Sequence, residues 1–88
     1  MEVQVLYLST NIYVVAKTKH QGPLVFLKDP QELHYTVNPD KTLSVTLTPF
    51  LPFSLQETSH GFAIHRDHIL YYGRTTTDIA NQYNQLTK

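Results

Sequence analysis

Cysteine is absent from this sequence of 88 residues. Its absence excludes a disulfide framework, zinc sites built on thiolates and a cysteine nucleophile. A chain of this length makes one domain, residues 1–88, and buries only about 60% of its unfolded surface. Because no disulfide supplements so small a core, we expect copies of the chain to associate.

Net charge is absent too, because seven lysine and arginine residues balance seven aspartate and glutamate residues. Proteins that hold the duplex backbone electrostatically are usually basic, so non-specific binding to duplex DNA is disfavoured. A chain without net charge does not repel its own copies, which again favours association.

Long apolar runs and catalytic signatures are also missing. No stretch approaches the roughly 18 apolar residues of a transmembrane helix. Residues 1–8 have neither the basic start nor the small-residue cleavage site of a signal peptide. There is no glycine-rich phosphate loop, and no recognised motif frames Ser54, Ser59 and His60. We therefore expect a protein that is not an enzyme, holds no cofactor and does not enter a membrane.

Short strands make up most of the sequence. Residues 2–8 and 12–19 are rich in β-branched and aromatic side chains and flank turn formers at 9–11, which predicts an antiparallel hairpin. Residues 24–27 form a short apolar run. Pro30 is expected to end that strand, since proline donates no hydrogen bond to a ladder.

Two cleanly alternating strands follow, at residues 32–37 and 42–48, around a turn at 38–41. One face of this pair is expected to point inward: Leu33, Tyr35, Val37, Leu43, Val45 and Leu47. Residues 49–53 contain too much proline for a central strand, and residues 54–60 are predicted to form a loop.

The only predicted helix covers residues 75–87. Thr75 is a candidate N-cap, and Ile79, Tyr83 and Leu86 form one apolar stripe at helical spacing. Five or six short strands with one C-terminal helix are typical of a small antiparallel barrel or sandwich.

The stretch at residues 60–74 reads as a hairpin of two short apolar strands joined by a polar turn of His65, Arg66, Asp67 and His68. A turn with this much hydrogen-bonding capacity is a candidate ligand site. The alternative is a solvated turn with an Arg66–Asp67 ion pair. A metal site is disfavoured, because no cysteine or carboxylate cluster completes a tetrahedral set with the two histidines.

Two segments resemble the Sm/LSm family of RNA-binding proteins. Residues 3–19, VQVLYLSTNIYVVAKTK, are similar to the opening hairpin of that family. Residues 64–69, IHRDHI, resemble its second motif, usually Ile-Arg-Gly-Asp/Asn-Asn-Ile. His65 and Arg66 stand at the Arg and Gly positions, and the loop at 20–22 lacks the family's Asp and Met-Asn. The whole chain resembles a short, phage-associated type with a C-terminal helix, which implies the cytoplasm, that of the host if a phage encodes it.

The resemblance implies a mainly β fold, a strongly bent antiparallel five-stranded barrel with one C-terminal helix. It also implies a closed ring of about five to seven copies. Single-stranded RNA would bind near the pore through His65, Arg66, Asp67 and His68 and the loop that contains His20 and Gln21. The last strand would form the seam between copies, through His68, Ile69, Leu70, Tyr71 and Tyr72.

The residues leave a second function open, that of an oligomeric structural or adaptor protein that binds other proteins and no nucleic acid. Zero net charge and the missing first-motif residues favour the adaptor, whereas the match at residues 64–69 favours RNA. Alternating tyrosines are a candidate stacking platform, although aromatic side chains in strands are more often core or interface residues. They are Tyr7, Tyr13, Tyr35, Tyr71 and Tyr72.

Overall fold

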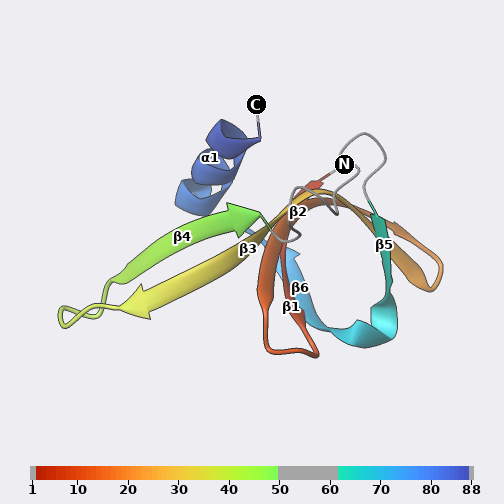
Figure 1. The fold of residues 1–88 in the computed structure, drawn as a ribbon, viewed down its shortest axis with the longest axis horizontal. Coiled ribbons are helices and arrows are strands. Elements are labelled where there is room, and N and C mark those ends of the chain that lie inside the picture. Colours follow the sequence, from red (N-terminus) through yellow and green to blue (C-terminus); the bar gives the residue numbers. More distant parts are fainter. Residues whose placement is uncertain (1, 50–61, 88) are drawn as a thin grey trace.

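The computed structural model describes residues 2–49 and 62–87 (Figure 1). Its elements are β1 (Glu2–Leu8), β2 (Tyr13–Gln21), β3 (Leu24–Val37), β4 (Leu43–Pro49), β5 (Phe62–His65), the 3-10 turn η2 (Arg66–His68), β6 (Ile69–Arg74) and α1 (Thr77–Leu86). The mainly β, antiparallel fold with one C-terminal helix is confirmed. The predicted loop at 54–60 and most of the proline-rich segment lie outside the described residues.

All six strands belong to one antiparallel sheet, with the order β4-β3-β2-β1-β6. Strand β3 carries two partners along its other edge, because β4 pairs with residues 31–37 and β5 with residues 24–27. The sheet curls strongly (Figure 1), but within the described residues β5 and β6 are joined by η2 and are not paired. The sheet is therefore open and has six strands, where a five-stranded barrel was predicted.

Strand β3 runs through the sequence at which a break was predicted. Lys17 lies opposite Lys28 and Val15 opposite Gln31, so Ala16 faces two residues of β3 in a bulge. Pro30 is one of these two residues, and a bulge does not need its missing N–H. The residue before it, Asp29, has a φ of 51°, which bends the strand. The prediction that Pro30 ends the strand is wrong for this reason.

The predicted hairpin at residues 60–74 is also wrong. Within the described residues β5 pairs with β3 and β6 pairs with β1, and η2 carries the chain from one to the other. Alternation along the sequence identified both strands correctly. It did not identify their partners, which are distant in the sequence.

The two faces of the sheet hold separate apolar clusters. The concave face buries side chains from β1, β2 and β3: Leu6, Leu8, Val14, Ala16, Val25 and Leu27. The opposite face buries Val15, Leu33 and Leu47 beneath Tyr83 of α1. The helix therefore covers only this second face, over the region where β2, β3 and β4 meet.

Helix α1 begins two residues later than predicted. The side chain of Thr76, not Thr75, caps it and accepts a hydrogen bond from the N–H of Ile79 at 3.4 Å. Tyr83 is fully buried, whereas Leu86 at the end of the predicted stripe is 54% exposed.

The β3–β4 hairpin extends away from the rest of the sheet (Figure 1). Leu33 and Leu47 at its base are buried, as predicted. Tyr35, Val37 and Leu43 were predicted to point inward but are 50%, 63% and 59% exposed, because they lie on the projecting part of the hairpin.

Candidate functional site

The turn η2 is attached by its backbone to two other turns of the sheet. At its start, the N–H of Arg66 donates to the carbonyl of Pro23 at 2.9 Å, in the turn between β2 and β3. At its end, the carbonyl of His68 accepts from the N–H of Ser9 at 2.8 Å, in the turn between β1 and β2. The conformation of η2 is thus fixed at both ends, while the side chains of its three residues are exposed.

The fold brings together the start of this turn and the other segment predicted to bind nucleic acid. Leu24 lies opposite both Gln21 of β2 and His65 of β5. Since neighbouring strands are 4.7–4.9 Å apart, Gln21 and His65 lie about 10 Å apart on one face. His20 and Gln21 belong to β2, although a loop was predicted there, and the turn itself is made at Gly22, which has a φ of 58°. His68 lies at the far end of η2, beside Ser9.

Asp67 contacts His65, where an ion pair with Arg66 was the predicted alternative. The Nδ1 atom of His65 accepts a hydrogen bond from the N–H of Asp67 at 3.2 Å and lies 3.4 Å from its Oδ2 atom. The first contact needs an Nδ1 atom that carries no hydrogen. The backbone and the side chain of Asp67 thus both contact the ring of His65 and orient it.

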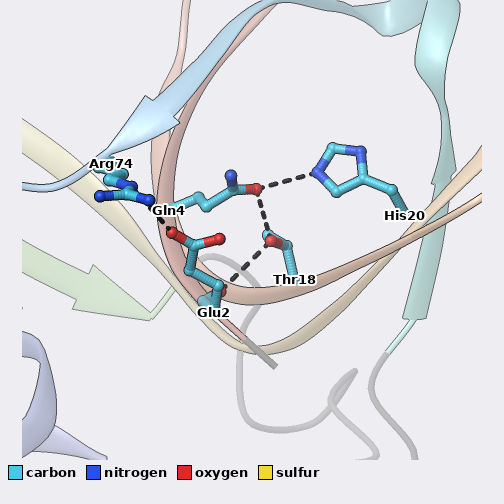
Figure 2. Close-up of polar contacts among 5 residues, drawn as sticks. All are labelled: Glu2, Gln4, Thr18, His20 and Arg74. Carbon is cyan, nitrogen blue, oxygen red and sulfur yellow. Dashed lines mark hydrogen bonds and ion pairs between the residues drawn. The ribbon is translucent and has the colours of Figure 1, made fainter.

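A second cluster of polar side chains lies on the concave face, at the start of β1 and the end of β2 (Figure 2). The side-chain carbonyl of Gln4 accepts from the hydroxyl of Thr18 at 2.6 Å and lies 2.9 Å from Nε2 of His20. Close by, Nε of Arg74 lies 3.4 Å from a carboxylate oxygen of Glu2. Figure 2 shows the side chains of Gln4, Thr18 and His20 inside the curl of the sheet, with Arg74 at its margin.

The ring of His20 also contacts Tyr72 of β6, with ring centroids 4.6 Å apart and planes inclined at 46°. His20 is thus held by Gln4 on one side and by an aromatic ring on the other, and it remains exposed. A planar imidazole beside a tyrosine offers a nucleobase two surfaces for stacking.

Sequence reasoning missed the group that Gln4 forms with Thr18 and His20, and it missed the contact between Glu2 and Arg74. One signal was available, because β2 becomes polar towards its end and Gln4 is a polar residue between the apolar side chains of β1. The contact with Arg74 could not be found in this way, since it depends on β6 lying beside β1, with Gln4 opposite Arg74.

The segment predicted to form a seam between copies is largely exposed. Leu70, Tyr71 and Tyr72 are 61%, 64% and 46% exposed. Strand β6 pairs with β1 along one edge, and no strand among the described residues lies along its other edge. Exposed apolar side chains and an unpaired edge are features of surfaces at which chains associate.

Within residues 2–49 and 62–87, no three histidine, aspartate or glutamate side chains lie close enough together to hold a metal ion. No helix in the same ranges has the length and apolar character needed to cross a bilayer. No protein-family model and no curated protein matches the chain.

Proposed function

We propose that the protein binds single-stranded RNA, as a ring of identical Sm-like subunits. The RNA surface comprises His65, Arg66, Asp67 and His68 with His20 and Gln21. The observation that carries this proposal is the hydrogen bond from the N–H of Arg66 to the carbonyl of Pro23, at 2.9 Å. It joins two segments that lie far apart in the sequence and were each predicted to contact RNA.

The chemistry of this surface suits a single strand. Arg66 offers a fixed charge and a planar group for phosphate or base contacts, and the exposed rings of His20, His65 and His68 offer stacking surfaces. A single arginine on the RNA surface of a subunit without net charge gives a weak field. In a ring the same cation recurs around the pore, which concentrates the positive potential.

The unpaired strand edges support the proposal of a ring. The outer edge of β6 and the outer edges of β4 and β5 have no neighbouring strand among the described residues. Pairing β6 of one copy with β4 or β5 of the next copy removes two of these three edges and covers Leu70 and Tyr71. The seam on one side consists of His68, Ile69, Leu70, Tyr71 and Tyr72.

The second candidate is an oligomeric adaptor that binds proteins and no nucleic acid. It is favoured by zero net charge together with the exposed apolar side chains of β6. A surface of this kind binds protein more readily than it binds a phosphate backbone.

The two candidates are separated by fluorescence anisotropy with labelled oligo-U and oligo-A at low and moderate salt, and by light scattering on the same samples. The proposal predicts a closed oligomer and RNA binding that weakens as salt increases. An oligomer that binds neither oligonucleotide would identify the adaptor. A monomer would contradict the ring.

A further inference from the structure

Strand β3 continues beyond the end of its neighbour β2. Leu33 lies opposite Tyr13, the first residue of β2. Before Tyr13 the chain turns towards β1, since Asn11 has a φ of 64° and the carbonyl of Ile12 accepts from the N–H of Leu8 at 2.9 Å. Residues 34–37 therefore pair with β4 along one edge, and no described strand lies along their other edge.

The hydrogen-bond pattern shows which backbone groups point to this open edge. The N–H of Asn38 donates to the carbonyl of Thr42 at 2.8 Å, across the hairpin. Because bonding alternates along an antiparallel ladder, Thr36 and His34 also bond towards β4. The N–H and carbonyl groups of Tyr35 and Val37 consequently point away from β4, towards the open edge.

A hollow of about 360 Å³ lies at the point where this edge leaves β2. Its volume is within the range of about 300–1,000 Å³ that is usual for ligand sites. Residues of β1, of β2 and of the turn between them line one wall, and residues 32–35 of β3 line the other. The hollow reaches both faces of β3, since consecutive side chains of a strand point to opposite faces.

The first face of the hollow is aromatic. The ring of Tyr13 stacks on Tyr7, with centroids 4.6 Å apart and planes at 28°. The same ring meets Tyr35 edge-on, with centroids 5.8 Å apart and planes at 76°. Tyr35 is 50% exposed, and the exposed side chains of Val37 and Leu43 continue this face outward. Apolar side chains of a partner would pack here.

The second face is acidic. The carboxylate of Glu32 lies 3.8 Å from Nε2 of His34, and that nitrogen lies 3.2 Å from the hydroxyl of Thr48. None of the described residues that line the hollow is a lysine or arginine. A carboxylate with no lysine or arginine beside it in the lining attracts positive charge and repels phosphate.

We propose that residues 34–37 accept an extended segment of a partner protein as an additional strand. The side chains of this segment alternate between apolar and basic. Its backbone bonds to Tyr35 and Val37, its apolar side chains pack against Tyr13 and Tyr35, and its basic side chains face Glu32. Backbone bonds supply affinity in this mode of recognition and alternate side chains supply specificity. The site shares no residue with the proposed RNA surface and does not depend on it.

The test uses the whole protein and a fluorescein-labelled peptide of alternating lysine and valine, with a peptide of alternating glutamate and valine as the matched control. Anisotropy should show that the basic peptide binds about five- to tenfold more tightly, since Glu32 attracts a lysine of one peptide and repels a glutamate of the other. Two further peptides carry backbone N-methyl groups, one on all its valines and the other on all its lysines. One of them should lose binding and the other should keep it, because the N–H groups of only one of these two sets face β3.

Variants assign the binding to this edge. Glu32→Gln should weaken binding of the basic peptide about two- to fivefold, as expected for one exposed charge pair. Glu2→Gln, which changes a carboxylate on β1 beside Arg74, should leave it unchanged. The proposal is overturned if the acidic peptide binds as tightly as the basic one, or if both methylated peptides bind equally. It is also overturned if Glu32→Gln tightens binding of oligo-U, which would make this an RNA surface.

Discussion

The hydroxyl of Tyr83 donates a hydrogen bond to the carbonyl of Lys28 at 3.0 Å. The same hydroxyl accepts from the N–H of Lys17 at 3.3 Å, and these two lysines face each other beside the bulge of β2 and β3. A side chain of the C-terminal helix thus satisfies backbone groups where the bend of the sheet disturbs the ladder. The helix is therefore expected to stabilise the bend as well as the apolar face.

Replacing Tyr83 with phenylalanine tests this relationship. The ring still fills its site, but two partly buried backbone groups lose a partner, so the free energy of unfolding should fall by about 1–3 kcal/mol. Urea denaturation followed by circular dichroism measures the change. Tyr71→Phe, at a side chain that is 64% exposed, is the control and should change it by less than about 0.5 kcal/mol. Equal denaturation midpoints for the two variants would show that the hydroxyl has no stabilising role.

Alkaline pH should destabilise the protein through the same residue. Burial raises the pKa of Tyr83 from 10.0 to about 12. The folded state holds this proton more tightly than the unfolded chain does, so stability is unaffected below pH 10 and decreases as pH rises towards 12. A pKa difference of two units corresponds to a loss of about 2–3 kcal/mol in the free energy of unfolding.

The measurement is the urea midpoint at several pH values across that window, for wild type and Tyr83→Phe. Burial also raises the pKa of Tyr13, which likewise lowers stability at alkaline pH. The urea midpoint of the variant should therefore still fall with pH, but less steeply than that of the wild type. A variant with the full wild-type slope would show that Tyr83 does not titrate in this way.

The start of α1 provides a third prediction. Thr76→Ala removes the acceptor of the Ile79 N–H and should lower the free energy of unfolding by about 0.5–1 kcal/mol. Thr75→Ala is the matched control, because this residue lies before the cap, and its effect should stay below about 0.5 kcal/mol. Urea denaturation of both variants measures the two effects. A larger loss of stability for Thr75→Ala than for Thr76→Ala would show that Thr75 is the cap, as the sequence alone predicted.

Proline at position 70 tests the proposed seam. Ile69 lies opposite Leu8 and Tyr71 opposite Tyr7, so the register shifts here and Leu70 has no partner on β1. Leu70→Pro should therefore spare the pairing with β1 and remove a donor from the outer part of β6, which dissociates the ring. Leu70→Ala keeps the N–H and should keep more of the assembly. Light scattering on both variants decides, and an unchanged mass for Leu70→Pro would exclude this segment from the seam.

Much of the fold could be predicted because local patterns determine it. The alternation in β1 and β4 depends on which side chains meet a core, and this is visible in a few residues. The end of β3 was misplaced at Pro30 because the rule that proline interrupts a ladder holds only where an N–H is needed. At a bulge none is needed, and the bulge depends on how β3 pairs with β2, which the sequence around Pro30 does not show.

The candidate site was only partly predictable for a related reason. The residues of η2 stand out by their polarity, but their position depends on β5 pairing with β3 and β6 with β1. These pairings are set by burial of apolar residues from five strands on the concave face, which no short window of sequence contains. The neighbours of His20 and the hollow beside Tyr35 depend on the same long-range pairings.

RNA affinity of Arg66→Ala tests the central claim most directly. In the proposed ring this substitution removes one charge-assisted contact per subunit, each worth about 1.5–3 kcal/mol. Binding of oligo-U should weaken at least about tenfold, while ring size and stability stay the same. Arg74→Ala, an exposed arginine paired with Glu2, is the control and should have a smaller effect. Full affinity of an intact Arg66→Ala ring, or no RNA binding by the wild type, would contradict the account.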